Sequence, residues 1–186
     1  MVFRKNLNKK IALISVYNKN NLKYLCSNLK KHNYSFMSTN STCLSIRSMG
    51  FDCLNISKLI KSKEILDGRV KTINKKIFGS ILFNRNNKKQ IDEFKKLAFP
   101  VIELVVINLY PFNKFINKDD LNKSIEMIDI GGPSLLRAAS KNFNSVTPIS
   151  SIKNYKKLIS NLNKNKGETD IKFRRKMASE TFKLTS

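Results

Sequence analysis

Short apolar segments rich in β-forming residues alternate with longer segments of helical periodicity along this chain. The most apolar segment is 101–108, VIELVVIN, which indicates a strand buried on both faces. The other predicted strands are 11–16, 34–38, 51–56, 77–83 and 144–150. Predicted helices lie at 18–32, within 39–50, at 88–99, from Pro133 to about 143, at 151–163 and at about 170–184. This alternation predicts an α/β fold of three layers, α/β/α, around a mainly parallel central sheet.

The length of 186 residues predicts one domain, residues 1–186, with a sizeable core. No apolar run approaches the ~20 residues that a membrane-spanning helix needs, so we expect no membrane partner. The apolar run IALISV follows a basic N-terminus, but it is short and lacks a small-residue cleavage site. We therefore interpret it as the first strand and not as a signal peptide.

Basic residues outnumber acidic residues by 36 to 13, which gives a net charge of +23. Such a charge favours anionic ligands and is also typical of nucleic-acid-binding proteins. The lysines, however, are spread among asparagines, as in NRNNKKQ and NLNKNKG, without interleaved aromatic residues. We therefore expect no nucleic-acid partner.

Cysteine and histidine usage argues against metal chemistry. Cys26, Cys43 and Cys53 form no C-x-x-C pair and have only His32 nearby. We expect reduced thiols in a cytoplasmic protein. Carboxylates do not cluster at ligand spacing either, so we expect no metal and no organic cofactor.

Polar residues follow several predicted strands at the point where each strand ends. Ser15 and Lys19 lie at the end of the first strand, 38–42 follows the second, and Asn108 and Tyr110 follow strand 101–108. In parallel sheets, ligands bind beyond the carboxyl ends of the strands. Hydroxyls, an ammonium group and helix-start N–H groups suit a phosphate, although each turn alone is also typical of helix capping. Neither a Walker loop nor a G-x-G-x-x-G fingerprint is present, so a nucleoside triphosphate or dinucleotide is not predicted.

Residues 128–143, IDIGGPSLLRAASKNF, place a carboxylate, a glycine pair and a helix start in one stretch. Asp129 lies just before Gly131 and Gly132, and Pro133 suits the first turn of a helix. The N–H groups of a helix start attract anions and developing negative charge. Taken alone, the stretch also fits an ordinary helix entry with a solvated basic face.

Four motifs together closely resemble the N-terminal, IMP cyclohydrolase domain of the bifunctional purine biosynthesis protein. They are IALISVYNK, LDGRVKT, VVINLYPF and IDIGGPSLLRAASKN, and the resemblance runs in register from about Lys10 to the C-terminus. It implies a methylglyoxal synthase-like fold and closure of the purine ring of 5-formamidoimidazole-4-carboxamide ribonucleotide to IMP, with loss of water. It also implies a homodimer. Because the family's transformylase domain is missing here, 165–186 is interpreted as the helix leading to it, and no transformylase activity is expected.

Carried over position by position, the resemblance implies a catalytic set of Lys71, Tyr110, Asp129 and Lys141. Asp129 would orient or deprotonate the carboxamide, and Lys141 would transfer a proton, serving the site of the neighbouring subunit. Lys71 and Tyr110 would polarise and protonate the leaving oxygen. The implied substrate-binding residues are Ser15, Lys19, Thr39, Asn40, Ser41, Thr42, Arg69, Thr72, Asn108 (against the base), Ile130, Gly131 and Gly132.

Several positions depart from the family pattern. Asn40 and Ser41 stand where the family has two glycines in its phosphate turn, and Tyr17 replaces a second serine. Asn74 and Phe78 replace a histidine each. At positions 40 and 41, a Cβ hinders close approach of the backbone to phosphate. Together, the departures are expected to affect phosphate affinity and loop geometry more than the catalytic set. The alternative that the sequence leaves open is a degraded or truncated relic that binds a phosphate ligand at most.

Overall fold

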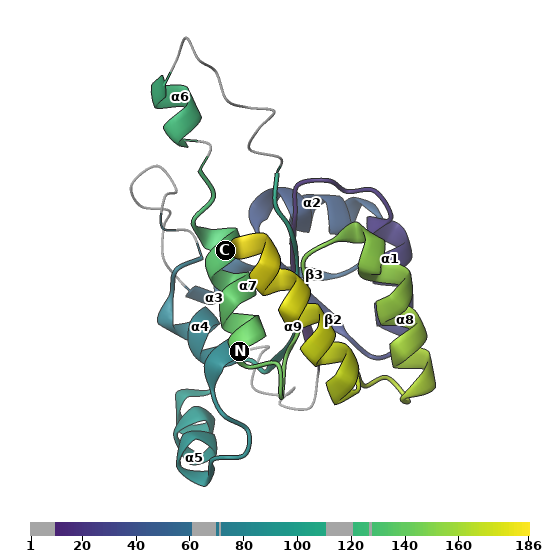
Figure 1. Cartoon of the computed structure of the whole chain (residues 1–186), viewed down its shortest axis with the longest axis vertical. Helices are drawn as coiled ribbons and strands as arrows, with labels where there is room; N and C mark the ends of the chain where they lie inside the picture. The colour runs from purple at the N-terminus through teal and green to yellow at the C-terminus, as the bar shows by residue number, and fades with distance from the viewer. Residues whose placement is uncertain (1–9, 61–69, 71, 111–120, 127) are drawn as a thin grey trace.

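The computed structural model describes residues 10–60, 70, 72–110, 121–126 and 128–186. Within these residues, five strands form one parallel sheet in the order β3-β2-β1-β4-β5. The strands are β1 (Ile11–Val16), β2 (Ser35–Ser38), β3 (Cys53–Asn55), β4 (Ile102–Asn108) and β5 (Thr147–Ile149). The helices are α1 (Leu22–Lys31), α2 (Asn40–Ser48), α3 (Ile56–Ile60), α4 (Lys75–Leu82), α5 (Lys88–Leu97), α6 (Leu121–Glu126), α7 (Gly131–Lys141), α8 (Tyr155–Lys164) and α9 (Ile171–Thr185), with a short 3₁₀ helix, η4 (Ile152–Asn154), before α8 (Figure 1).

Successive residues of the central strands face opposite sides of the sheet, where they enter two separate apolar clusters. Ala12 and Ile14 of β1 pack with the buried faces of α1, α2 and α8. Ile11 and Leu13 pack with those of α4 and α7. Figure 1 shows α1 and α8 side by side, apart from α4 and α7. The predicted three-layer α/β/α arrangement around a parallel sheet is therefore confirmed.

Residues 77–83, predicted as a strand, belong to helix α4 instead. An apolar run of this length, IFGSILF, suits either element. The Asn74 side chain accepts a hydrogen bond from the Lys76 N–H and caps the helix start. Ile77 and Ile81, four residues apart, are both fully buried. The cap and the helical spacing of these two isoleucines together favour the helix.

Five of the six predicted strands and all six predicted helices are present, most of them with shorter bounds. The strand predicted at 51–56 is limited to β3, because Ile56 begins α3. The sequence does not predict α3 or α6. Helix α7 begins at Gly131, two residues before Pro133, so that this proline lies within its first turn.

Helix α9 covers the β5 side of the sheet and packs against α7 and β5, burying Met177, Ala178 and Thr181. Asp170 caps it by accepting a hydrogen bond from the Phe173 N–H (2.7 Å). That residues 165–186 lead to a further domain stays a prediction. None of the helices in the described part of the chain is both long and apolar enough to span a membrane.

Cys26, Cys43 and Cys53 are free thiols, and all three are buried. Burial raises the pKa of Cys26 to about 12 and also raises the pKa of Cys53. These two thiols stay protonated at neutral pH and act as small apolar core side chains.

Candidate functional site

The strand order reverses between β1 and β4, and this point defines the site. From β1 the chain adds β2 and β3 on one side, then β4 and β5 on the other. Connections therefore leave the carboxyl ends of β1 and β4 in opposite directions, which leaves room for a ligand between them. The predicted site residues at the ends of β1, β2 and β4 all lie along this carboxyl edge.

Hydroxyl groups join the carboxyl ends of β1 and β2. The Ser15 and Thr39 hydroxyls are hydrogen-bonded to each other (2.9 Å). Thr42 is buried, and its hydroxyl both accepts from the Val16 N–H (3.1 Å) and donates to the Val16 carbonyl oxygen (3.2 Å). The Thr42 side chain therefore holds α2 against β1, whereas Ser15 and Thr39 lie at the partly exposed edge.

The start of α2 presents N–H groups at this edge. The backbone N–H groups of Asn40, Ser41 and Thr42 have no acceptor among the described residues, and the first internal bond runs from Cys43 N–H to the Thr39 carbonyl. Such a helix start attracts an anion. Asn40 and Ser41 are not among the residues with positive φ, so the missing glycines leave no backbone strain here. Their side chains are exposed in the first turn of α2.

Lys19 and Asn108 lie at the same edge, on either side of the switch point. Lys19 is half-buried in the turn between β1 and α1. The Asn108 side chain is hydrogen-bonded to the backbone of Asn18 in that turn through both its oxygen and its nitrogen (2.9 Å each). Sequence motifs do not reveal the part that Asn18 plays, because its hydrogen bonds to Asn108 are made by its backbone N–H and carbonyl groups.

Asp129 and Tyr110 lie at the other end of the site. Asp129 Oδ1 accepts a hydrogen bond from the Gly132 N–H (2.8 Å) at the start of α7. Tyr110 follows β4, and its ring contacts that of Tyr17 edge to face, with centroids 5.8 Å apart. Partial burial, and then the negative charge of Asp129, raise the pKa of the Tyr110 phenol. The carboxylate and the phenol are therefore electrostatically coupled.

The two glycines at the start of α7 are required by close packing. A Cβ on Gly131 would lie 2.6 Å from Thr72 Oγ1. A Cβ on Gly132 would collide with the Asp129 carboxylate and lie 2.7 Å from Leu109 Cδ2. The glycines thus allow Thr72, Asp129 and the end of β4 to approach the helix start.

The structure does not place Lys141 near Asp129. It is the last residue of α7, ten residues after Gly131, and it is exposed. At 1.5 Å per residue, ~15 Å of helix separates it from the Asp129 end. Within one chain, therefore, Lys141 and Asp129 cannot act on the same atoms.

Two predicted residues, Arg69 and Lys71, lie outside the described residues. Within the part of the chain that is described, no three His, Cys, Asp or Glu side chains form a group that could hold a metal ion.

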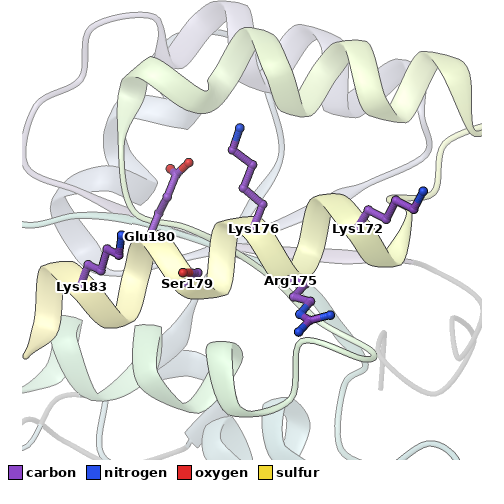
Figure 2. A pocket seen from close by; sticks show the side chains of 6 residues that line it. All are labelled: Lys172, Arg175, Lys176, Ser179, Glu180 and Lys183. Carbon is purple, nitrogen blue, oxygen red and sulfur yellow. The ribbon is translucent and has the colours of Figure 1, made fainter.

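A hollow of about 490 Å³ lies along the exposed side of α9, and Figure 2 shows its side chains in close-up. It is lined by Lys172, Arg175, Lys176, Ser179, Glu180 and Lys183. No predicted site residue lines it. Cations on an exposed helix are expected in a chain with a net charge of +23, so we assign this hollow no function.

Comparison with known proteins agrees with this geometry. A family model described as "MGS-like domain" matches residues 21–134, and one described as "AICARFT/IMPCHase bienzyme" matches residues 139–186. A solved structure titled "Crystal structure of ForH" superposes with a TM-score of 0.86 at 27% identity, covering 95% of this chain and 91% of the other. The fold is therefore that of the MGS-like domain.

Two similar relatives are named "Bifunctional purine biosynthesis protein PurH". The protein from Microcystis aeruginosa is 39% identical over 180 residues, and that from Caldicellulosiruptor bescii is 40% identical over 182. The matches cover 95% and 97% of this chain but only 35% of each relative's length. The chain therefore belongs to the MGS-like domain family and corresponds to the N-terminal part of the bifunctional purine biosynthesis protein.

Proposed function

We propose that this chain is an IMP cyclohydrolase, which closes the ring of 5-formamidoimidazole-4-carboxamide ribonucleotide to give IMP and water. The observation that carries the proposal is the position of the Asp129 carboxylate, which the Gly132 N–H holds at the start of α7, close enough to Tyr110 after β4 to raise the pKa of its phenol. Its support is the similarity of 95% of the chain to purine biosynthesis enzymes.

The reaction joins two groups that already lie on one imidazole ring. The carboxamide nitrogen attacks the formyl carbon, and the formyl oxygen leaves as water. An amide nitrogen is a poor nucleophile because its lone pair is delocalised, so the site must help to remove an N–H proton and to stabilise and protonate the oxygen. Holding the two groups in the reactive rotamer supplies part of the rate.

Asp129 and Tyr110 suit the two proton transfers. The Asp129 carboxylate is fixed through Oδ1 by the Gly132 N–H, while Oδ2 has no hydrogen-bond partner among the described residues and can accept the carboxamide proton. The Tyr110 phenol, whose pKa is raised above its already alkaline ordinary value, keeps its proton at neutral pH and can donate it to the leaving oxygen. Lys71 is proposed to assist Tyr110, as the resemblance implies.

The start of α7 can stabilise the oxygen while it carries negative charge. The N–H groups of Ile130 and Gly131 have no acceptor among the described residues. Both lie at the positive end of the helix dipole, beside the Asp129 carboxylate. Donors that are already in place need no rearrangement during the reaction, which is the condition for efficient oxyanion stabilisation.

The phosphate of the ribonucleotide is proposed to bind at the start of α2. The free N–H groups there, the partly exposed hydroxyl of Thr39 and the ammonium group of Lys19 all lie at the carboxyl edge. Arg69 and Thr72 would complete this end of the site. Binding the phosphate here would direct the base towards Asp129 across the switch point.

The proposed enzyme acts as a homodimer in the cytoplasm, without a cofactor. A catalytic role for Lys141 requires a second copy of the chain, since α7 holds this residue ~15 Å from the Asp129 end. Each site would then combine Asp129 of one chain with Lys141 of the other.

The proposal is tested by incubating the purified protein with the formamido ribonucleotide and following ring closure by ultraviolet absorbance. Formation of IMP from the formamido ribonucleotide without any added transformylase is the expected result. If the protein binds the ribonucleotide and does not close the ring, the phosphate-binding relic is the correct reading. Absence of both binding and turnover contradicts both.

Restoring the glycine pair is expected to lower the stability of the protein and to raise its affinity for the phosphate. The double variant Asn40→Gly/Ser41→Gly removes two side chains from the first turn of α2 and the hydrogen bond between Asn55 and Asn40 (3.2 Å). We expect the free energy of unfolding to fall by about 1 kcal/mol and KM to fall as well, since the phosphate can approach the backbone more closely. Denaturant unfolding and steady-state kinetics measure the two effects.

The matched control is Ser45→Gly/Ser48→Gly, at the other end of α2. It is expected to lower stability by a similar amount without changing KM. A lower KM in both double variants would show that helix loosening, and not access to the phosphate, is responsible.

A further inference from the structure

Three hydrogen bonds join the ends of β1 and β4 across the switch point. The Tyr17 N–H donates to the Asn108 carbonyl oxygen (3.3 Å). The Asn18 N–H donates to Asn108 Oδ1, and Asn108 Nδ2 donates to the Asn18 carbonyl oxygen (2.9 Å each). Since Asn108 is the last residue of β4, its side-chain amide takes the place of the next peptide group in the ladder. The amide therefore extends the pairing of β1 with β4 beyond the end of both strands.

The turn held by this amide contains Lys19. Asn18 Oδ1 accepts the Asn20 N–H (2.8 Å), and the Lys19 carbonyl oxygen accepts the Leu22 N–H at the start of α1 (3.1 Å). The path of the turn is thus fixed at one end by Asn108 and at the other by α1. Lys19 lies between these two anchors, so its direction depends on both.

Tyr155, the first residue of α8, is a buried neighbour of the Asn108 side chain. It is only 2% exposed. Burial raises the pKa of Tyr155 to about 12, an effect that the neighbouring Asn108 side chain opposes. The Tyr155 hydroxyl makes no hydrogen bond of normal geometry with any described residue, so it does not compete with Asn18 for the Asn108 amide. Asn154 Nδ2 donates to Glu180 Oε2 (2.7 Å) and fixes the start of α8 against α9.

We propose that Asn108 is a positioning residue, whose side-chain amide directs Lys19 towards the phosphate of the substrate. This inference rests on the proposed function and differs from the expectation that Asn108 contacts the base. The amide oxygen and one amide hydrogen are both bonded to the Asn18 backbone, so the side chain is committed to the turn. Its effect on binding is therefore exerted through Lys19.

Hydrogen exchange at the Asn18 amide tests whether the Asn108 side chain holds the turn, and it does not require activity. Asn108→Ala is expected to speed exchange of the Asn18 N–H by ~10-fold or more, while the amides of Leu13 and Val105 in the paired strands keep their rates. The control Asn28→Ala removes a comparable amide bond, from Asn28 Nδ2 to the Tyr24 carbonyl (2.8 Å), and is expected to leave Asn18 unchanged. If the Asn18 N–H of the wild-type protein exchanges as fast as in an unfolded chain, the Asn108 side chain does not hold the turn.

Binding of ribose 5-phosphate, measured by calorimetry, tests whether Asn108 acts through Lys19. This probe has a phosphate and no base. Asn108→Ala and Lys19→Ala should each weaken its binding by ~10-fold, and the double variant should bind no more weakly than Lys19→Ala alone, because coupled residues are not additive. Unchanged affinity in Asn108→Ala, additive losses, or no measurable binding to the wild-type protein would each overturn the proposal.

Asn108→Asp provides a second variant in case Asn108→Ala does not fold. It keeps the size and the acceptor, but it places a charge instead of a donor against the Asn18 carbonyl. Losses of the same sign are expected. Since neither measurement requires turnover, a wild-type protein that fails to close the ring contradicts the proposed function and leaves the positioning role to be decided by exchange and binding.

Discussion

Asp129→Asn is expected to lower kcat for ring closure by ~10²–10⁴, the range typical of a lost general acid–base group. The substitution keeps an oxygen that can accept the Gly132 N–H bond at the start of α7 (2.8 Å). Asparagine and aspartate cap helices about equally well, so the free energy of unfolding should change by less than ~0.5 kcal/mol. The amide cannot take up the carboxamide proton. Kinetics in the ultraviolet and denaturant unfolding therefore separate the chemical role of Asp129 from its structural role.

Asp170→Asn is the matched control. Asp170 also accepts a hydrogen bond at a helix start, from the Phe173 N–H of α9 (2.7 Å), but it is not among the candidate site residues. The kcat of the Asp170→Asn variant should equal that of the wild-type protein, even if the loss of charge beside Asn161 lowers the stability of the variant. A wild-type kcat for Asp129→Asn would exclude Asp129 as the group that accepts the proton.

The layers and the parallel sheet could be predicted because alternation over the whole chain is a strong signal. A short run such as 77–83 carries no such signal, because a short buried helix and a short buried strand have similar apolar compositions. What favours the helix in α4 is the Asn74 cap together with the burial of Ile77 and Ile81, which lie four residues apart. Burial is a tertiary property, which sequence spacing alone does not give.

The edge of the sheet on which the candidate residues lie could be predicted from the strand ends, but the hydrogen-bond partner of each side chain could not. Ser15, Thr39 and Asn108 all lie at the expected edge. The Thr42 hydroxyl, however, is used by the Val16 backbone, and the Asn108 amide by the Asn18 backbone. Competition between backbone groups and ligand for the same polar side chain depends on distances across the sheet, which only the folded structure provides.

Asp129→Asn and Lys141→Ala chains, each nearly inactive alone, are expected to regain activity when they are mixed. Helix α7 separates the two residues by about its whole length, so a site that uses both would have to draw them from two chains. In a mixed dimer, one site then has both residues and the other has neither. Joint unfolding and refolding gives about half mixed dimers by random pairing, so about a quarter of the wild-type rate should return.

The control mixture combines Lys141→Ala with the double variant Asp129→Asn/Lys141→Ala. No pairing of these chains supplies Lys141 to any site, so the rate should stay at the level of the separate chains. Sedimentation should show dimers in every mixture, because neither substitution changes a buried apolar side chain. If the two single variants also stay inactive when mixed, although mixed dimers form, then Lys141 does not complete the neighbouring site and is one more exposed lysine on a basic surface.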